Sequence, residues 1–254
     1  MPYSERMRFA IETALMAGRS TRAHFQSSVT VDRKRDMSPV TVADRHAETL
    51  IRDAIRERYP EDGIYGEEHG ISGTADRRWV IDPIDGTKSF ICGVPLYATL
   101  LSYEIEGEVK LGIAYFPALD ELVCAELGGG THWNGRPARV SSNTQLENAT
   151  LCIGGHKTAA ERGVSQAFEK LSYQVLATRT WSDAYGHALV ATGRVDAMID
   201  PRVEHYDISA MSIIVSEAGG TFTRLNGDPT LGTDAISSSG VFHDQLVAAF
   251  RGPA

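Results

Sequence analysis

Residues 79–88, with the sequence WVIDPIDGTK, run from an apolar segment directly into a turn that carries two carboxylates. The apolar part has the composition of a buried strand, and Pro83 lacks the N–H that a central strand needs, so we expect the strand to stop there. Asp82 and Asp85 would then project from one strand end and could converge on one point. Carboxylate oxygens at such a point suit Mg²⁺ or Mn²⁺ better than zinc. The segment therefore predicts a divalent-metal site.

A phosphate-binding turn is predicted directly after these carboxylates. Gly86 and Thr87 open a short helical turn, whose free backbone N–H groups can bind an anion. Taken alone, the string DPIDG also describes an ordinary turn, because Asp, Pro and Gly are the usual turn formers. Two more acidic residues at element ends, Glu67 and Asp207, favour the metal site, although each alone could be a solvated loop charge or a helix N-cap.

The charge balance excludes several classes of partner. The 254 residues include 33 acidic and 25 basic side chains, which gives a formal net charge of −8. Such a surface repels nucleic acid and anionic membranes, but it can accept a small phosphorylated substrate if bound cations supply positive charge. The three cysteines form no CxxC pair, and the apolar runs are too short to cross a bilayer. We expect a cytoplasmic protein without a nucleic-acid or membrane partner.

Helical and strand-like segments divide the chain into two parts. Predicted helices cover residues 7–17, 43–59, 159–171, 183–191, 208–218 and 244–250, and predicted strands cover residues 63–66, 79–81, 97–105, 109–116, 121–127, 150–153, 173–176 and 197–199. Strands cluster in the first part, whereas strands and helices alternate in the second. We expect an N-terminal part, residues 1–140, that carries most metal ligands, and a C-terminal part, residues 141–254, that completes one catalytic unit.

Five motifs are similar to those of the inositol monophosphatase family, the lithium-sensitive type of metal-dependent phosphatase. In chain order they are TVADRHAE, GEE, WVIDPIDGTKSF, LVATGRVDAMID and HYDISAMSIIVSEAGG, at residues 41–48, 66–68, 79–90, 189–200 and 205–220. Within the family, KSFICGVPLYATLLSY and TWSDAYG, at residues 88–103 and 180–186, most resemble the phosphatases that act on histidinol phosphate. The resemblance spans nearly the whole chain. It implies a layered α/β fold, an α-β-α-β-α sandwich, and a homodimer.

The resemblance also implies metal ligands and catalytic residues. Two or three Mg²⁺ ions, for which Mn²⁺ could substitute, would be held by Glu67, Asp82, the main-chain carbonyl of Ile84, Asp85 and Asp207. Asp44 and Thr87 would be hydrogen-bonded to each other and would help to orient and deprotonate the attacking water. Glu67 is counted among the catalytic residues as well. The backbone amides of Gly86 and Thr87 would hold the phosphate.

Four residues near the predicted phosphate site bear on the choice of substrate. At Asp183, where inositol-specific relatives have a small apolar residue, a carboxylate would cost desolvation unless it met a cation. Histidinol phosphate carries an amino group and an imidazole, so Asp183 and Glu204 would find partners on it. Asp200 stands where relatives contact a substrate hydroxyl, and Arg202 could reach the substrate. Alternatively, Asp183 caps the helix that follows it and Arg202 is an ordinary surface residue.

Hydrolysis of histidinol phosphate, in histidine biosynthesis, is therefore the predicted reaction. The alternatives are inositol-1-monophosphatase, a fructose-1,6-bisphosphatase or nucleotide bisphosphatase of the same family, and a non-catalytic metal-binding protein of the same fold. Asp44 and Thr87 disfavour the last, because a purely structural cation site needs no pair that activates water. Lys34 and Arg35 fall where the family has a loop that completes the metal site, or in an ordinary loop.

Overall fold

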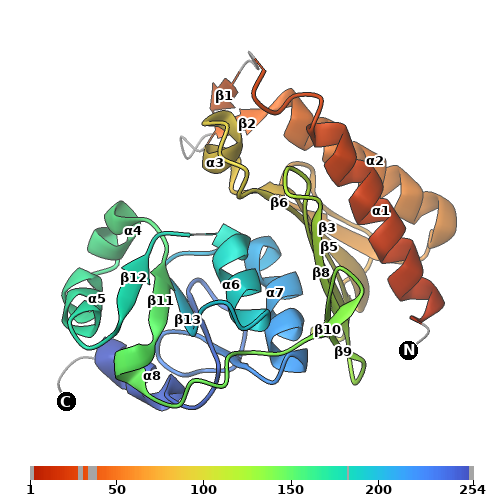
Figure 1. The fold of residues 1–254 in the computed structure, drawn as a ribbon. Coiled ribbons are helices and arrows are strands. Elements are labelled where there is room, and N and C mark those ends of the chain that lie inside the picture. Colours follow the sequence, from red (N-terminus) through yellow and green to blue (C-terminus); the bar gives the residue numbers. More distant parts are fainter. Residues whose placement is uncertain (1–2, 28–30, 34–38, 182, 252–254) are drawn as a thin grey trace.

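Helices and sheets alternate through the molecule in the order helix, sheet, helix, sheet, helix (Figure 1). The computed structural model describes residues 3–27, 31–33, 39–181 and 183–251, so Lys34 and Arg35 lie outside the described residues. The outer layer on one side holds α1 (Glu5–Thr21) and α2 (Val42–Arg58), the central layer holds α6 (Asp183–Ala191) and α7 (His205–Glu217), and the outer layer on the other side holds α4 (His156–Glu161), α5 (Ser165–Ser172) and α8 (His243–Phe250). This arrangement confirms the predicted α-β-α-β-α sandwich.

Eight described strands form the larger sheet. Their order is β10 (Arg136–Ala138), β9 (Gly130–Trp133), β8 (Glu121–Glu126), β7 (Glu108–Phe116), β6 (Ala98–Ile105), β5 (Arg77–Asp85), β3 (Gly63–Gly66) and β4 (Gly70–Ser72). Neighbouring strands are antiparallel except for the parallel pair β3 and β5. A two-residue turn, Glu106-Gly107, joins β6 to β7.

The prediction that β5 stops at Pro83 is wrong. The strand continues to Asp85 through a bulge: Asp82 pairs with Leu100 and Asp85 pairs with Ala98, and the register shifts between them. At a bulge the extra residues are left out of the regular pairing, so a proline without an N–H is tolerated there. Pro83 still contributes its carbonyl, which accepts a hydrogen bond of 2.9 Å from the Thr99 hydroxyl.

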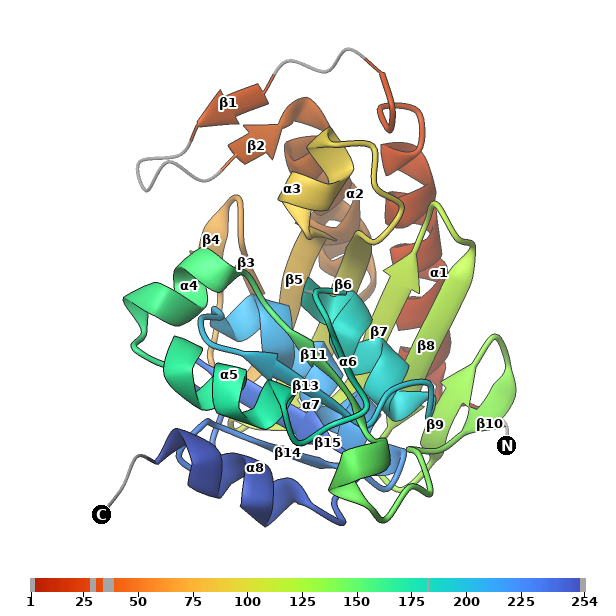
Figure 2. The same cartoon turned by 60° about the vertical axis from the view of Figure 1, so that its left-hand side comes forward.

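Five described strands form the smaller sheet, which lies between the central helices and the layer of α4, α5 and α8 (Figures 1 and 2). Their order is β12 (Ala177–Arg179), β11 (Thr150–Ile153), β13 (Ala197–Asp200), β15 (Ala235–Ser238) and β14 (Thr221–Thr223). β11 is parallel to both β12 and β13, while β15 is antiparallel to β13 and β14. Outside the two sheets lie the hairpin of β1 (Val31–Arg33) and β2 (Pro39–Thr41), the short helix α3 (Thr87–Ile91) and the 3-10 turn η1 (Leu146–Asn148).

Burial of apolar faces holds the layers together. Ala47, Ile51 and Ile55 form a stripe on α2 that packs against Trp79 and Ile81 of β5. The central helices are apolar on most sides because both sheets cover them, and their side chains join the two parts of the chain in one core cluster. None of the described helices combines the length and the apolar composition needed to cross a membrane. The division into parts 1–140 and 141–254 stays a prediction.

Two predictions in the C-terminal part are wrong. The helix expected over residues 159–171 is interrupted at residues 162–164, between α4 and α5. The strand expected over residues 173–176 is a turn, in which the side chains of Tyr173 and Leu176 are 82% and 70% exposed. The strand at this place is β12, which begins one residue later. The apolar residues of this segment produce a strand-like pattern in the sequence, but two of them, Tyr173 and Leu176, are exposed and are not part of the core.

Candidate active site

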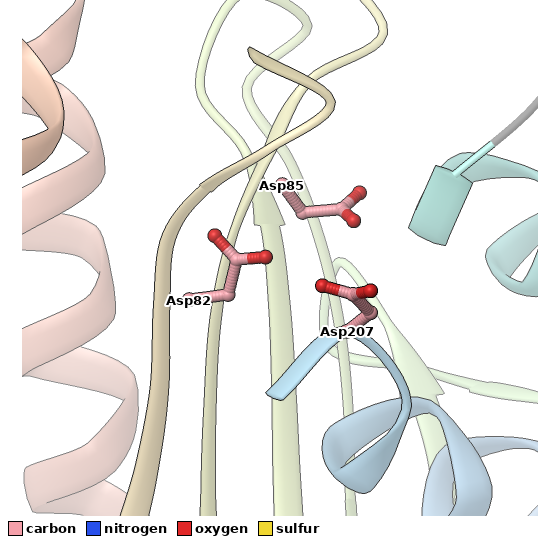
Figure 3. Close-up of side chains that lie close together, drawn as sticks. All are labelled: Asp82, Asp85 and Asp207. Carbon is pink, nitrogen blue, oxygen red and sulfur yellow. The ribbon is translucent and has the colours of Figure 1, made fainter. Parts of the chain in front are cut away.

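Three carboxylates from two distant segments point toward one another (Figure 3). Asp82 and Asp85 come from the end of β5, and Asp207 comes from the first turn of α7. One ligand oxygen of each lies within 4.8 Å of the others. The predicted convergence of Asp82 and Asp85 with Asp207 is therefore present in the structure.

The bulge and turn at the end of β5 are fixed by their own side chains. Asp82 accepts a hydrogen bond of 3.1 Å from the N–H of Ile84, and the Thr87 hydroxyl donates one of 3.1 Å to the Ile84 carbonyl. Gly86 has a φ of 77°, a left-handed conformation that glycine adopts without strain, and it directly precedes α3. Metal-ligand candidates and the predicted phosphate-binding amides are thus parts of one short, rigid segment.

Backbone N–H groups of the central helices hold the other two carboxylates. Asp85 accepts a hydrogen bond of 2.8 Å from the N–H of Ala184, at the start of α6. Asp207 accepts one of 2.7 Å from the N–H of Glu204 in a capping box at the start of α7. The positive ends of two helices therefore face the acidic cluster, which lowers the cost of holding negative charge there.

Electrostatic repulsion within the cluster is strong. Burial raises the pKa of Asp82 well above its usual range, and the charges of Glu67, Asp85 and Asp207 raise it further. Burial and the charge of Asp183 do the same to the pKa of Asp85. Burial raises the pKa of Asp207 to about 7, even though the Glu204 N–H acts in the opposite direction. Hard oxygen donors that repel one another in a buried site fit small divalent cations, which would supply the missing positive charge.

Asp44 lies in the first turn of α2, as predicted, but its hydrogen bonds differ from the expected ones. Its Oδ2 accepts from the N–H and the hydroxyl of Thr41, at 2.8 and 2.6 Å, and so closes a capping box. The expected hydrogen bond between Asp44 and Thr87 is absent, because the Thr87 hydroxyl bonds to Ile84 instead. Asp44 Oδ1 is buried and has no partner among the described residues. Asp44 is fully buried and lines neither of the two cavities that adjoin the carboxylates, so the structure does not bring it together with the other predicted site residues.

Two cavities that share lining residues adjoin the carboxylates. One, of about 190 Å³, is lined by Glu67, Asp82, Ile84, Asp85, Gly86, Thr87, Lys88, Asp183, Arg202 and Asp207. The other, of about 200 Å³, shares five of these residues and adds Asp200 and residues of α4 and α6. Predicted metal, phosphate and substrate residues are thus brought together. Glu204 lines neither cavity, since it is the N-cap of α7.

The substrate side of the cavities is acidic at its base and basic at its mouth. Asp183 has a φ of 59°, and the N–H of the next residue is capped by Asp85 rather than by Asp183. Burial raises the pKa of Asp200 well above its usual range, as do the charges of Asp183 and Asp207. Arg202 is exposed and forms an ion pair of 2.9 Å with Glu161 of α4.

His187 lines the second cavity and was not predicted from the sequence. His187 is buried and lies one helical turn after Asp183, a spacing that places both on the same face of α6. Its Nδ1 lies 2.8 Å from the Ser237 hydroxyl, and its Nε2 has no partner among the described residues. Burial lowers the pKa of His187 to about 3, so the imidazole is neutral.

His205 and a buried glutamate anchor α7 to the larger sheet. Glu104 of β6 accepts hydrogen bonds from His205, at 2.6 Å, from Ser209, at 2.7 Å, and from Arg78, at 2.8 Å. His205 lines neither of the two cavities. Burial alone would raise the pKa of Glu104, but these donors hold it below its usual range.

Comparisons with known proteins find similarity over nearly the whole chain. Residues 3–252 match the model of the inositol monophosphatase family. The chain is 39% identical to a histidinol-phosphatase of Chlorobaculum parvum over 96% of this chain and 95% of that one. It is 36% identical to a fructose-1,6-bisphosphatase/inositol-1-monophosphatase of Thermotoga maritima over 96% and 94% of the two chains. A solved IMPase structure from Thermotoga maritima has a TM-score of 0.90 at 34% identity and covers 98% of this chain and 97% of that one.

Proposed function

The chain belongs to the inositol monophosphatase family, and we propose that it is a Mg²⁺-dependent phosphatase that hydrolyses histidinol phosphate to histidinol and inorganic phosphate. The carboxylate of Asp183 carries this proposal. It lines both cavities, and its negative charge adds to those of Asp85 and Asp200, so this part of the cavities favours a cationic group on the ligand. The histidinol-phosphatase names of similar chains from three organisms support the same substrate.

Glu67, Asp82, Asp85, Asp207 and the carbonyl of Ile84 would hold the Mg²⁺ ions, two or three in number, with Mn²⁺ as a substitute. When bound, such ions neutralise phosphoryl oxygens and make water acidic enough to react at neutral pH. The four carboxylates supply oxygen donors only, which suits a hard cation. Because these carboxylates repel one another when no cation is bound, a divalent cation would relieve the repulsion.

The remaining residues would align the phosphate ester and the attacking water. The N–H groups of Gly86 and Thr87 would bind phosphoryl oxygens, with the exposed Lys88 nearby at the cavity mouth. Thr87 donates its hydroxyl proton to Ile84, so its oxygen remains free to accept a hydrogen bond from water. Asp44 would accept a proton of that water: its Oδ1 lacks a partner among the described residues, although the side chain lines neither cavity. In the hydrolysis, water would attack phosphorus as one of its protons passes to Asp44. The bond to the alcohol oxygen would break, and the departing alkoxide would take up one proton, which balances the one that water gave up.

Asp183 would bind the amino group of histidinol, and Asp200, at the base of the second cavity, would bind another polar group of the alcohol. Arg202 would act at the cavity mouth, where its pairing with Glu161 limits its reach. A contact from Glu204 stays a prediction, since this residue caps α7. The homodimer, the cytoplasmic location and a role in histidine biosynthesis also stay predictions.

Phosphate release from a panel of monoesters tests the proposal. Histidinol phosphate, inositol 1-phosphate and fructose 1,6-bisphosphate should be compared by kcat/KM with and without Mg²⁺, because specificity is a ratio of these values. We expect no release without the ion and the highest kcat/KM for histidinol phosphate. Preference for inositol or fructose phosphates would overturn the substrate assignment, and release without any divalent ion would overturn the metal dependence.

A further inference from the structure

Glu48 is a fully buried glutamate of α2 that the proposed chemistry does not use. It lies four residues after Asp44, on the same face of the helix. Its Oε2 accepts a hydrogen bond of 2.7 Å from the N–H of Glu68. Its Oε1 accepts one of 3.2 Å from the N–H of His69 and one of 2.7 Å from Nε of Arg52. The carboxylate thus holds the turn that follows β3.

Arg52 extends this grip to the far side of the turn. Its side chain is 5% exposed and pairs with Glu48 one helical turn earlier. It also donates to the carbonyl of Gly70 and, at 3.2 Å, to the hydroxyl of Ser72, both in β4. A buried ion pair on one helix therefore bonds to the turn and to the strand beyond it.

The approach of Glu48 to the turn is close enough to restrict the sequence there. A Cβ atom added to Gly66 would lie 2.0 Å from Glu48 Oε1 and 2.9 Å from the Arg52 guanidinium. Glycine at position 66 is therefore required for the ion pair to reach the backbone. The GEE motif, residues 66–68, thus combines a contact residue, a cavity residue and a backbone donor to Glu48.

Glu67 lies between two fixed points. Its own N–H donates a hydrogen bond of 3.1 Å to the carbonyl of Ile81, the residue before Asp82. The N–H of the next residue, Glu68, is held by Glu48. The backbone on both sides of the Glu67 side chain is therefore tied, on one side to the strand that carries Asp82 and on the other to α2.

We propose that Glu48 is a positioning residue of the metal centre, which acts by holding Glu67 at the cavity that also contains Asp82. This role rests on the proposed function, because it assumes that Glu67 binds a divalent cation. Without Glu48, two backbone N–H groups and the Arg52 guanidinium would lose their buried acceptor, and the turn would move to reach other partners. Removing such an outer partner of a ligand typically weakens metal affinity by about 10- to 100-fold.

Direct binding of Mn²⁺ to the metal-stripped protein, measured by calorimetry and by the spin resonance of free Mn²⁺, tests this role. Glu48→Gln should weaken Mn²⁺ binding about tenfold or more. Asp62→Asn is the matched control: the Asp62 side chain is 4% exposed and accepts hydrogen bonds from Arg6 and Trp79, but it lines neither cavity. We expect a lower melting temperature in both variants and weaker Mn²⁺ binding only in the first.

A double variant shows whether Glu48 acts through Glu67. If it does, Glu48→Gln should have little further effect on Mn²⁺ affinity in a Glu67→Gln background. Glu48→Asp, which keeps the charge for Arg52 but withdraws it from the turn, should weaken binding in the same way and serves if Glu48→Gln fails to fold. Unchanged affinity in these variants, or an equal further loss in the Glu67→Gln background, would overturn the positioning role alone. Equal binding by the wild type and Asp82→Asn would instead refute the metal centre itself.

Discussion

Replacing Asp183 by asparagine removes one negative charge from the cavities while keeping the size of the side chain. Asp183 has a φ of 59°, and asparagine tolerates this left-handed conformation as well as aspartate does. The backbone at the start of α6 should therefore stay in place, because the N–H of Ala184 is bonded to Asp85. The variant Asp183→Asn isolates the charge from the shape.

The size of the effect follows from the position of Asp183. The residue is half-buried, so a hydrogen-bonded contact with the substrate ammonium contributes about 1.5–3 kcal/mol, or about 10- to 150-fold in kcat/KM. This loss should appear mainly in KM for histidinol phosphate. Glycerol 2-phosphate has no cation and should lose nothing. The activity of the Asp183→Asn variant should also extend to lower pH than that of the wild type. The reason is that the charge of Asp183 raises the pKa of Asp85 and Asp200 in the wild type.

Steady-state phosphate release at saturating Mg²⁺ measures both substrates. Asp53→Asn is the control, since it makes the same change of net charge at an exposed position on α2. We expect this control to match the wild type with either substrate. An equal loss of kcat/KM on histidinol phosphate and on glycerol 2-phosphate would refute the assignment of Asp183 to the substrate cation.

Three further outcomes follow from the buried charges. Asp82→Asn should abolish Mg²⁺-dependent phosphate release yet raise the melting temperature of the metal-free protein, because it removes one of several mutually repelling carboxylates; a fall would contradict that repulsion. The pKa of Asp207, about 7 when folded against an ordinary 3.8, means that folding takes up a proton. The metal-free protein should therefore become more stable as pH falls from about 7 toward about 4, and melting curves in EDTA that show the opposite slope would exclude it. Glu104→Gln should lower the free energy of unfolding by about 1–3 kcal/mol, since His205, Arg78 and Ser209 share that acceptor, and an unchanged urea midpoint would show that the network adds no stability.

Local patterns predicted the elements that carry the site. The apolar stripe of α2 and the apolar residues before Asp82 mark buried surfaces, and such periodicity reflects each segment's own contact with a core. The convergence of Asp82 and Asp85 also followed from their spacing. Asp207 stood out by its place at an element end, but its convergence with Asp82 was predicted only from the family motif, because no local rule relates residues 82 and 207.

Contacts between distant segments could not be predicted in the same way. Asp85 as the cap of α6, and Glu48 as an acceptor for the turn after β3, depend on how layers pack rather than on neighbouring residues. The prediction at Pro83 was wrong because a residue in a bulge does not need the N–H that proline lacks. The bulge depends on the pairing of β5 with β6, which the local sequence does not show. The Asp44 carboxylate is likewise used by Thr41 of its own capping box, a competitor that the family comparison did not reveal.

The hydrogen bond from Ala184 to Asp85 has a consequence for how ligands enter and leave. Asp85 belongs to the larger sheet and Ala184 to the central helices, so the same carboxylate that would bind a cation also joins these two layers. Separating the two layers to admit a substrate would break this hydrogen bond and move Asp85 away from Asp207, the candidate ligand on α7. Exchange of ligands should instead use the open mouth of the cavities, where Lys88 and Arg202 are exposed. An incoming dianion would meet these two cations first, and turnover would proceed with the layers closed throughout.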